Sequence, residues 1–144
     1  MKEKTIKDIT YLLNERNLTA SVIRKKEYAG DIIIPKTVVD SNMSYPVTRI
    51  GDYAFEGCSS LMDITIPDGI TSVGKNVFAH CSSLTAISVP KNVKEISTGY
   101  EVRVKEIFIG LPYYRCEIDK YTDFHYYKYE YPIGAFHGCL GISA

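Results

Sequence analysis

A block of residues recurs along this chain at an offset of 23 positions, and it limits the fold more than any other feature. The segment 51–67 reads GDYAFEGCSSLMDITIP, and the segment 74–90 reads GKNVFAHCSSLTAISVP. Glycine, phenylalanine, cysteine, two serines, leucine, isoleucine and proline keep their places in both. A unit this short cannot bury its own apolar edge, so units must stack around a shared core. The repeat therefore predicts a solenoid.

The apolar spacing inside one unit indicates how each coil is built. Leu61, Ile64 and Ile66 follow a Leu-x-x-Ile-x-Ile pattern whose last part alternates as a β-strand does. The next residue, Pro67, cannot donate to a strand ladder and turns the chain. Phe55 supplies the buried side of a return arm. We expect a β-rich solenoid with a short parallel sheet on one side and turns and short helical segments on the return arms.

The pattern continues in both directions with changes in spacing. Upstream, 31–35 (DIIIP) matches the strand and its proline, but a nine-residue insertion follows it. Val38–Tyr45 within this insertion reads as a β-hairpin. Downstream, 104–109 (VKEIFI) matches the strand, and 134–140 (GAFHGCL) matches the return arm.

These strings resemble the BspA-type leucine-rich repeats of bacterial surface proteins, most clearly in IGDYAFEGCSSL at 50–61 and ITIP at 64–67. The segment from Tyr11 to Pro35 is similar to the first module of such proteins. The resemblance covers about residues 9–109 and returns weakly at 133–140. It implies a bacterial surface or secreted protein that adheres to host proteins or to other cells, and it identifies no ligand.

We expect a single domain over residues 1–144, with the repeats at 32–109. Residues 9–23 read as a β-hairpin, and the segment 9–31 would cap the first coil at the N-terminus. The first eight residues are expected to be a helical turn or a disordered lead. Residues 133–144 read as a degenerate final repeat, whose unfinished strand indicates either a truncated array or a homodimer through this C-terminal edge.

The segment 110–132 departs from the repeat and contains eight of the seventeen aromatic residues of the chain. One interpretation is a tyrosine-rich recognition loop, since tyrosine offers a large amphipathic contact at low entropic cost. The other is a C-terminal cap, because Tyr127, Tyr129 and Tyr131 alternate as in a strand. The two roles are compatible.

Composition and charge argue against several classes of function. The chain has 17 basic and 17 acidic residues and no basic stripe, so we expect no nucleic-acid partner. No apolar run is long enough for a membrane span, and the N-terminus has no signal peptide as it stands. A location at the cell surface or outside the cell therefore rests on the family resemblance alone.

The cysteines and histidines offer little chemistry. Cys58 and Cys81 recur with the repeat, which is typical of small buried slots holding free thiols. The histidines lack the spacing of a metal site. Cys116 with His125 is the least unfavourable nucleophile and base, but no helix start or glycine-rich turn beside Cys116 would lower its pKa. We expect no enzyme activity, no metal and no cofactor.

The side chains between the buried strand positions should form columns on the solvent-facing side of the sheet, which we call the inner face. One column would contain Ile33, Thr65, Ser88 and Phe108. The other would contain Asp31, Asp63, Ala86 and Glu106. The candidate ligand-binding residues are Asp63, Thr65, Ser88, Glu106, Phe108, Tyr113, Tyr114 and Tyr126.

These features predict a non-catalytic binding module. It would contact a host or bacterial surface protein through the inner face and the tyrosine-rich segment. The alternative is a carbohydrate-binding module that stacks sugars on exposed tyrosines.

Overall fold

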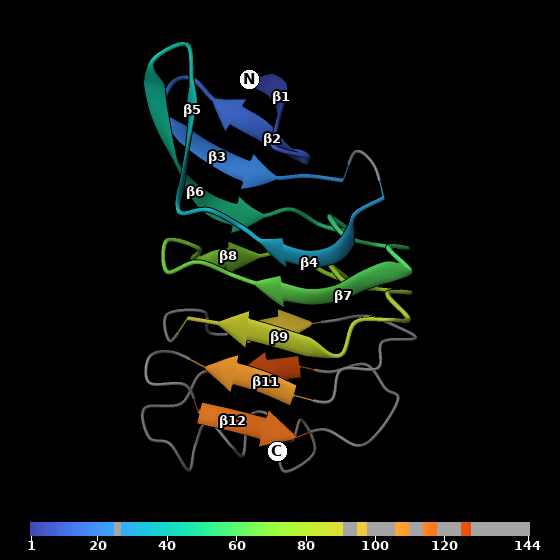
Figure 1. The fold of residues 1–144 in the computed structure, drawn as a ribbon. Helices are drawn as coiled ribbons and strands as arrows, with labels where there is room; N and C mark the ends of the chain where they lie inside the picture. Colours follow the sequence, from blue (N-terminus) through green and yellow to red (C-terminus); the bar gives the residue numbers. More distant parts are fainter. Residues whose placement is uncertain (25–26, 91–94, 98–105, 110–113, 118–124, 128–144) are drawn as a thin grey trace.

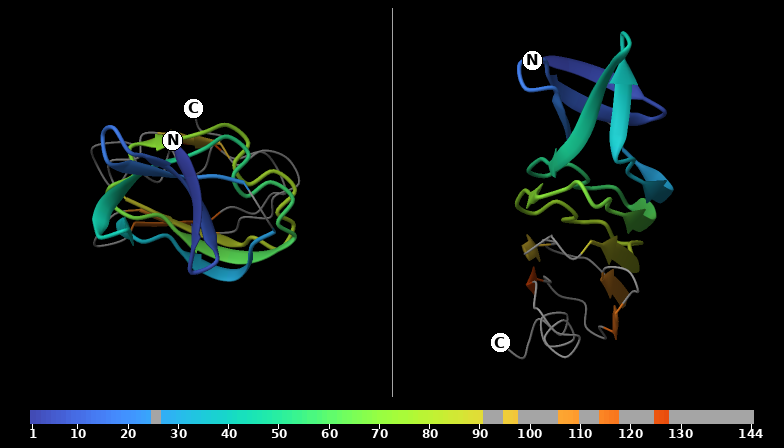
Figure 2. Two further views of the ribbon diagram at one scale, coloured as in Figure 1. Left: turned by 90° about the horizontal axis from the view of Figure 1, so that it is seen from above. Right: turned by 90° about the vertical axis from the view of Figure 1, so that its left-hand side faces the viewer.

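The computed structural model of the chain describes residues 1–24, 27–90, 95–97, 106–109, 114–117 and 125–127, with side chains up to residue 90. Its strands form two larger sheets on opposite sides of a stack of coils (Figures 1 and 2). One sheet contains β4 (Ala29–Ile33), β7 (Ser60–Thr65), β9 (Ala86–Val89), β11 (Glu106–Ile109) and β12 (Tyr114–Glu117).

The second sheet contains β1 (Lys2–Ile6), β2 (Ile9–Asn14), β3 (Thr19–Val22), β5 (Thr37–Asp40), β6 (Met43–Ile50) and β8 (Ser72–Val73). A two-stranded antiparallel sheet pairs β10 (Glu95–Ser97) with β13 (His125–Tyr127). No helix in the described part of the chain is long and apolar enough to cross a membrane.

The 23-residue repeat forms coils that stack through parallel strand pairing, as predicted. Strands β4, β7, β9 and β11 pair in that order and all in parallel. The ladder continues past the strand ends, where Ile34 N donates to Thr65 O (3.1 Å) and Ile66 N to Ser88 O (2.9 Å). On the other side of each coil, Ile50 of β6 is in register with Val73 of β8.

The return arms, residues 51–58 and 74–81, consist of turns rather than helix, so the predicted short helical segments are not confirmed in the described residues. Tyr53 and Gly57 have φ values of 58° and 76°, and Asn76 has 47° at the position equivalent to Tyr53. Left-handed residues interrupt a helical ladder. The backbone amides instead bond the next coil, as Phe55 N does to Val77 O (3.0 Å).

The core consists of columns of like residues from successive coils. Leu61 and Leu84, like Ile64 and Ile87, are fully buried. An aromatic ladder contains the rings of Tyr28, Phe55 and Phe78, with centroid distances of 4.8 Å and then 5.6 Å along the stack. This stacking buries the apolar edge that a single coil would leave exposed.

The N-terminal hairpin is present, and it has a third strand that the sequence did not predict. β2 and β3 pair antiparallel, which confirms the hairpin at 9–23. β1 pairs with β2, so the expectation of a helical turn or a disordered lead is wrong. The reason is the tight turn at Lys7 and Asp8, whose φ values of 47° and 73° suit a two-residue hairpin.

The nine-residue insertion forms the predicted hairpin. β5 and β6 pair antiparallel around Ser41 and Asn42, whose φ values of 51° and 64° are those of a type I′ turn. β6 continues beyond the hairpin and pairs in parallel with β3 and β8, which joins the cap to the coils. The predicted final repeat at 133–144 lies outside the described residues.

Candidate functional site

Strand register aligns the two predicted columns of the inner face. Asp31 pairs with Asp63, Asp63 with Ala86, and Ala86 with Glu106. The second column follows in the same ladders, with Ile33, Thr65, Ser88 and Phe108 in register. Residues that share a register position point to the same face of a parallel sheet. The side chains of β4, β7 and β9 thus form two aligned rows on the inner face, and the backbone register of β11 continues both rows.

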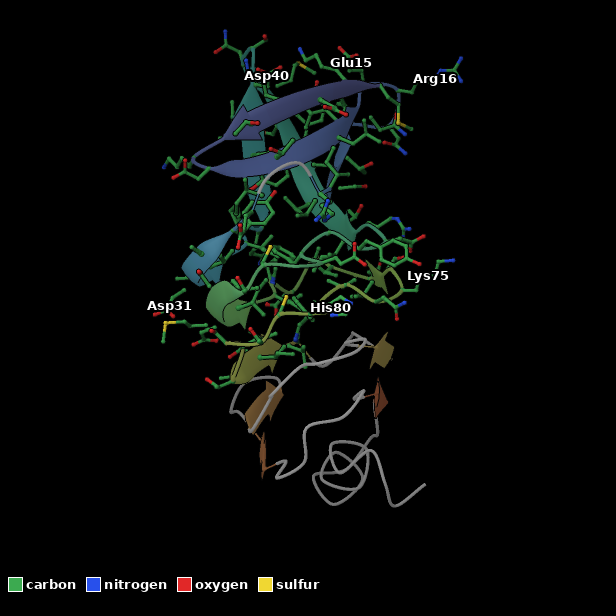
Figure 3. The ribbon with its side chains drawn as sticks, turned by 90° about the vertical axis from the view of Figure 1, so that its right-hand side faces the viewer. Glu15, Arg16, Asp31, Asp40, Lys75 and His80 are labelled. Carbon is green, nitrogen blue, oxygen red and sulfur yellow. The ribbon has the colours of Figure 1, made fainter. Side chains whose placement is uncertain are left out.

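The row that contains Asp31, Asp63, Ala86 and Glu106 is called the acidic row. The Asp63 carboxylate in this row has an unfavourable electrostatic environment. Asp63 is partly buried, and within the described residues its Oδ1 atom has no hydrogen-bond partner. Burial raises the pKa of Asp63, and the negative charge of Asp31 raises it further, against an interaction with the backbone N–H of Ile64 that lowers it. Asp31 itself is exposed, on the same side of the stack as β4 and β7 (Figure 3). A cationic or hydrogen-bond-donating group placed here would relieve this repulsion.

The row that contains Ile33, Thr65, Ser88 and Phe108 is called the neutral row. Its described side chains are two small polar ones and one larger apolar one. Thr65 and Ser88 are partly exposed, whereas the Ile33 side chain is 72% exposed. Met62 adds a second exposed apolar side chain, at 55%. It lies at a register shift, because Gly30 pairs with Leu61 and Asp31 with Asp63, which leaves Met62 as the extra residue of β7.

Met62 was not among the candidate residues, and the repeat spacing contains the signal that could have found it. Two residues separate Leu61 from Ile64, whereas strict alternation allows one. One of these two residues, Met62 or Asp63, therefore cannot follow the alternation of inward and outward side chains along the strand.

The candidate ligand-binding residues lie in different parts of the fold, and one of them lies outside the described residues. Asp63, Thr65 and Ser88 lie together on adjacent strands, and the backbone register places Glu106 and Phe108 in line with them. Tyr114 belongs to β12 and pairs with Ile109. Tyr126 belongs to β13, which pairs with β10 in a different sheet, so the backbone does not place it on the inner face. Tyr113 lies outside the described residues.

The cysteines of the repeat are buried free thiols, as predicted. Burial raises the pKa of Cys58, and it raises that of Cys81 to about 12. The Cys81 thiol donates to Phe55 O at 2.9 Å. A thiol that stays protonated is a poor nucleophile and a poor metal ligand, so both cysteines act here as core residues.

No metal-binding arrangement occurs within the part of the chain that the structure describes, where no three His, Cys, Asp or Glu side chains gather. His80 is exposed on a return arm. Cys116 and His125 are described by their backbone only, in β12 and β13, and His137 and Cys139 lie outside the described residues.

The repeat matches a known family of protein repeats. Residues 21–100 match the BspA type leucine rich repeat region, in six copies. The match begins at the end of β3 and covers the insertion and the repeats through 100. No curated protein sequence matches the chain.

Solved structures of bacterial leucine-rich-repeat proteins are similar over most of the chain. A leucine-rich repeat protein from Bacteroides ovatus is 30% identical, with a TM-score of 0.64, over 75% of this chain and 30% of that one. A leucine rich cell surface protein from Faecalibacterium prausnitzii is 29% identical, with a TM-score of 0.55, over 74% and 26%. The leucine rich repeat protein of T. pallidum is 25% identical, with a TM-score of 0.53, over 65% and 42%. The chain therefore spans less than a third of the first two proteins.

Proposed function

Because the chain belongs to the BspA-type leucine-rich-repeat family, we propose that it is a non-catalytic binding module of a bacterial surface, with its ligand site on the inner face. The observation that supports this site is the strand register, which aligns exposed and partly exposed side chains of β4, β7 and β9 in two rows. A preorganised face of this kind loses little conformational entropy when a partner binds.

The partner that we propose is a protein at the surface of a host cell or of another bacterium. Surface location is supported by the Faecalibacterium prausnitzii relative, which is a cell surface protein. The chemistry of the inner face agrees with a protein ligand, since the acidic row accepts hydrogen bonds and Ile33 and Met62 offer exposed apolar contact. The tyrosine-rich segment at 110–132 would extend this contact surface.

The test is binding of the purified chain to a panel of extracellular-matrix proteins and glycans on a biosensor. The site variant carries Thr65→Arg and Ser88→Arg, which place two long cations on the inner face and leave the core intact. The control variant carries Thr71→Arg and Ser82→Arg, which make the same charge change at exposed positions off the five-stranded sheet.

Binding to a protein that the site variant loses by tenfold or more and the control keeps would support the proposal. Binding that both variants keep would exclude the inner face and direct attention to the tyrosine-rich segment. Binding to glycans that free sugar competes away would favour the carbohydrate-binding alternative. Urea unfolding of each variant shows whether a loss of binding reflects a loss of fold.

A further inference from the structure

The sheet of the N-terminal cap is curled so that its two edge strands approach each other. β1 and β5 are the ends of that sheet, and no ladder joins them within the described ranges. Asp40 nevertheless forms ion pairs with β1, at 2.7 Å to Lys2 Nζ and 3.6 Å to Lys4 Nζ. We call the line along which β1 and β5 face each other the seam. These ion pairs close one end of the seam.

The other end of the seam is open. A groove of about 430 Å³ lies there, between the β1–β2 turn (Ile6, Lys7, Ile9), the end of β4 (Ile33) and β5 (Val38, Val39). The Ile33 and Val39 side chains are 72% and 59% exposed, so they give the groove an apolar wall that solvent reaches.

A third strand edge borders the same groove. β4 is the terminal strand of the five-stranded sheet, with β7 on one side. Ile34 N donates to Thr65 O of that neighbour (3.1 Å). Backbone groups of successive strand residues point to opposite sides, so the N–H and C=O of Ile33 point away from β7, toward the open edge. Free backbone groups of this kind pair readily with another extended chain.

The charge that lines the groove is positive. Lys7 is the charged residue among those that line it, and no carboxylate lines it. Two exposed charged residues lie beside lining residues in the sequence, Lys36 between Pro35 and Thr37, and Asp8 between Lys7 and Ile9. Positive charge therefore exceeds negative charge at the rim, and the ammonium group of Lys7 in the wall of an apolar groove favours an occupant with carboxylates beside its apolar side chains.

We propose that this groove binds an extended peptide segment of a partner protein by strand addition, with apolar side chains at alternate positions and acidic residues at its flank. The backbone of the segment pairs with the open edge at Ile33, and its apolar side chains fill the groove. Its carboxylates face Lys7 and Lys36. Thr65 and Ser88 do not line the groove, although Ile33 borders both surfaces. A loss of binding with Val39→Glu therefore tests this proposal separately from a loss with Thr65→Arg and Ser88→Arg.

The experiment selects phage-displayed random dodecapeptides on the full chain, with counter-selection on the Val39→Glu variant. Selected peptides are then synthesised, and their affinities are measured by fluorescence anisotropy. Val39→Glu and Lys7→Glu test the groove, and Thr71→Glu is the control, because it places a carboxylate at an exposed position outside the groove and off the inner face. Circular dichroism confirms that each variant is folded.

We expect peptides with alternating apolar residues and net negative charge, whose affinity falls about tenfold or more with Val39→Glu and with Lys7→Glu, and stays unchanged with Thr71→Glu. Replacing the central residues of such a peptide by proline should abolish binding, because proline cannot donate to the ladder. The proposal is overturned if no peptide distinguishes the chain from Val39→Glu, if basic peptides are selected, or if the proline peptides bind equally well.

Discussion

The closeness of successive coils depends on the absence of a side chain at Gly74. A Cβ atom added there would lie 2.5 Å from the backbone N of Asp52 and 2.7 Å from its Cα, in the coil before it. Ordinary contact begins near 3.4 Å, and a backbone cannot turn aside as a flexible side chain can. The φ angle of Gly74 is not positive, so an alanine there would meet no strain from its own backbone torsion.

We expect Gly74→Ala to lower the free energy of unfolding by about 2 kcal/mol. The coil must move outward by most of an ångström, which weakens three hydrogen bonds around the contact. These are Gly74 N to Ile50 O (2.7 Å), Lys75 N to Asp52 Oδ1 (2.9 Å) and Tyr53 N to Lys75 O (3.1 Å). Each contributes about 1 kcal/mol, and the lower entropy of the unfolded alanine chain returns about 0.5 kcal/mol.

Urea unfolding followed by circular dichroism measures the effect, with Gly51→Ala as the control. Gly51 occupies the same place one repeat earlier, but a Cβ there would meet the Val22 carbonyl oxygen at 3.2 Å, a contact that a shift of a few tenths of an ångström relieves. We expect Gly51→Ala to change stability by less than about 1 kcal/mol. A neutral Gly74→Ala, or equal losses in the two variants, would refute this account of coil spacing.

Three further substitutions test other parts of the fold by the same urea assay. Phe55→Ala removes the middle ring of the aromatic ladder and should cost about 3–5 kcal/mol; a loss below about 1.5 kcal/mol would mean that the ladder is not close-packed. Gly57→Ala should cost about 1–2 kcal/mol, since φ there is 76°, and Gly57→Asn should cost less, because asparagine tolerates this region; equal costs would argue against strain. Asp40→Asn removes the ion pair with Lys2, which holds the pKa of the Asp40 carboxyl below its usual value. The stability from this lowered pKa is present above the unfolded value near 3.9 and is lost as pH falls through the folded value, so the gap in urea midpoint between wild type and Asp40→Asn should shrink from pH 6 to pH 3. A gap that is constant with pH would contradict this.

The repeated part of the fold was predictable because its period repeats one physical constraint. Leu61, Ile64 and Phe55 recur at the same spacing, so each coil independently indicates which side chains face the core. The register of the inner face follows from that spacing, which is why the columns through Thr65 and Ser88 could be named before the structure.

The N-terminal cap and the hairpin insertion were harder to predict than the coils, because neither segment is repeated along the chain. The strand β1 contains two lysines and a glutamate among its five residues and lacks a clear apolar alternation, so its pairing with β2 comes from the turn rather than from a pattern. The groove beside β5 depends on how the cap curls over the first coil, through contacts such as Lys2 with Asp40. Contacts between segments far apart in sequence leave no local pattern.

The in-register parallel ladder also determines how such an array can grow. Duplication of one 23-residue unit between Pro67 and Pro90 would add one strand to each side of the stack and lengthen it by about 4.8 Å. Each row of the inner face would gain one side chain, and the cap would keep its contacts with the first coil. Contact surface could therefore be enlarged in equal steps by duplication of a gene segment, with the identity of each new surface residue free to change separately from the core.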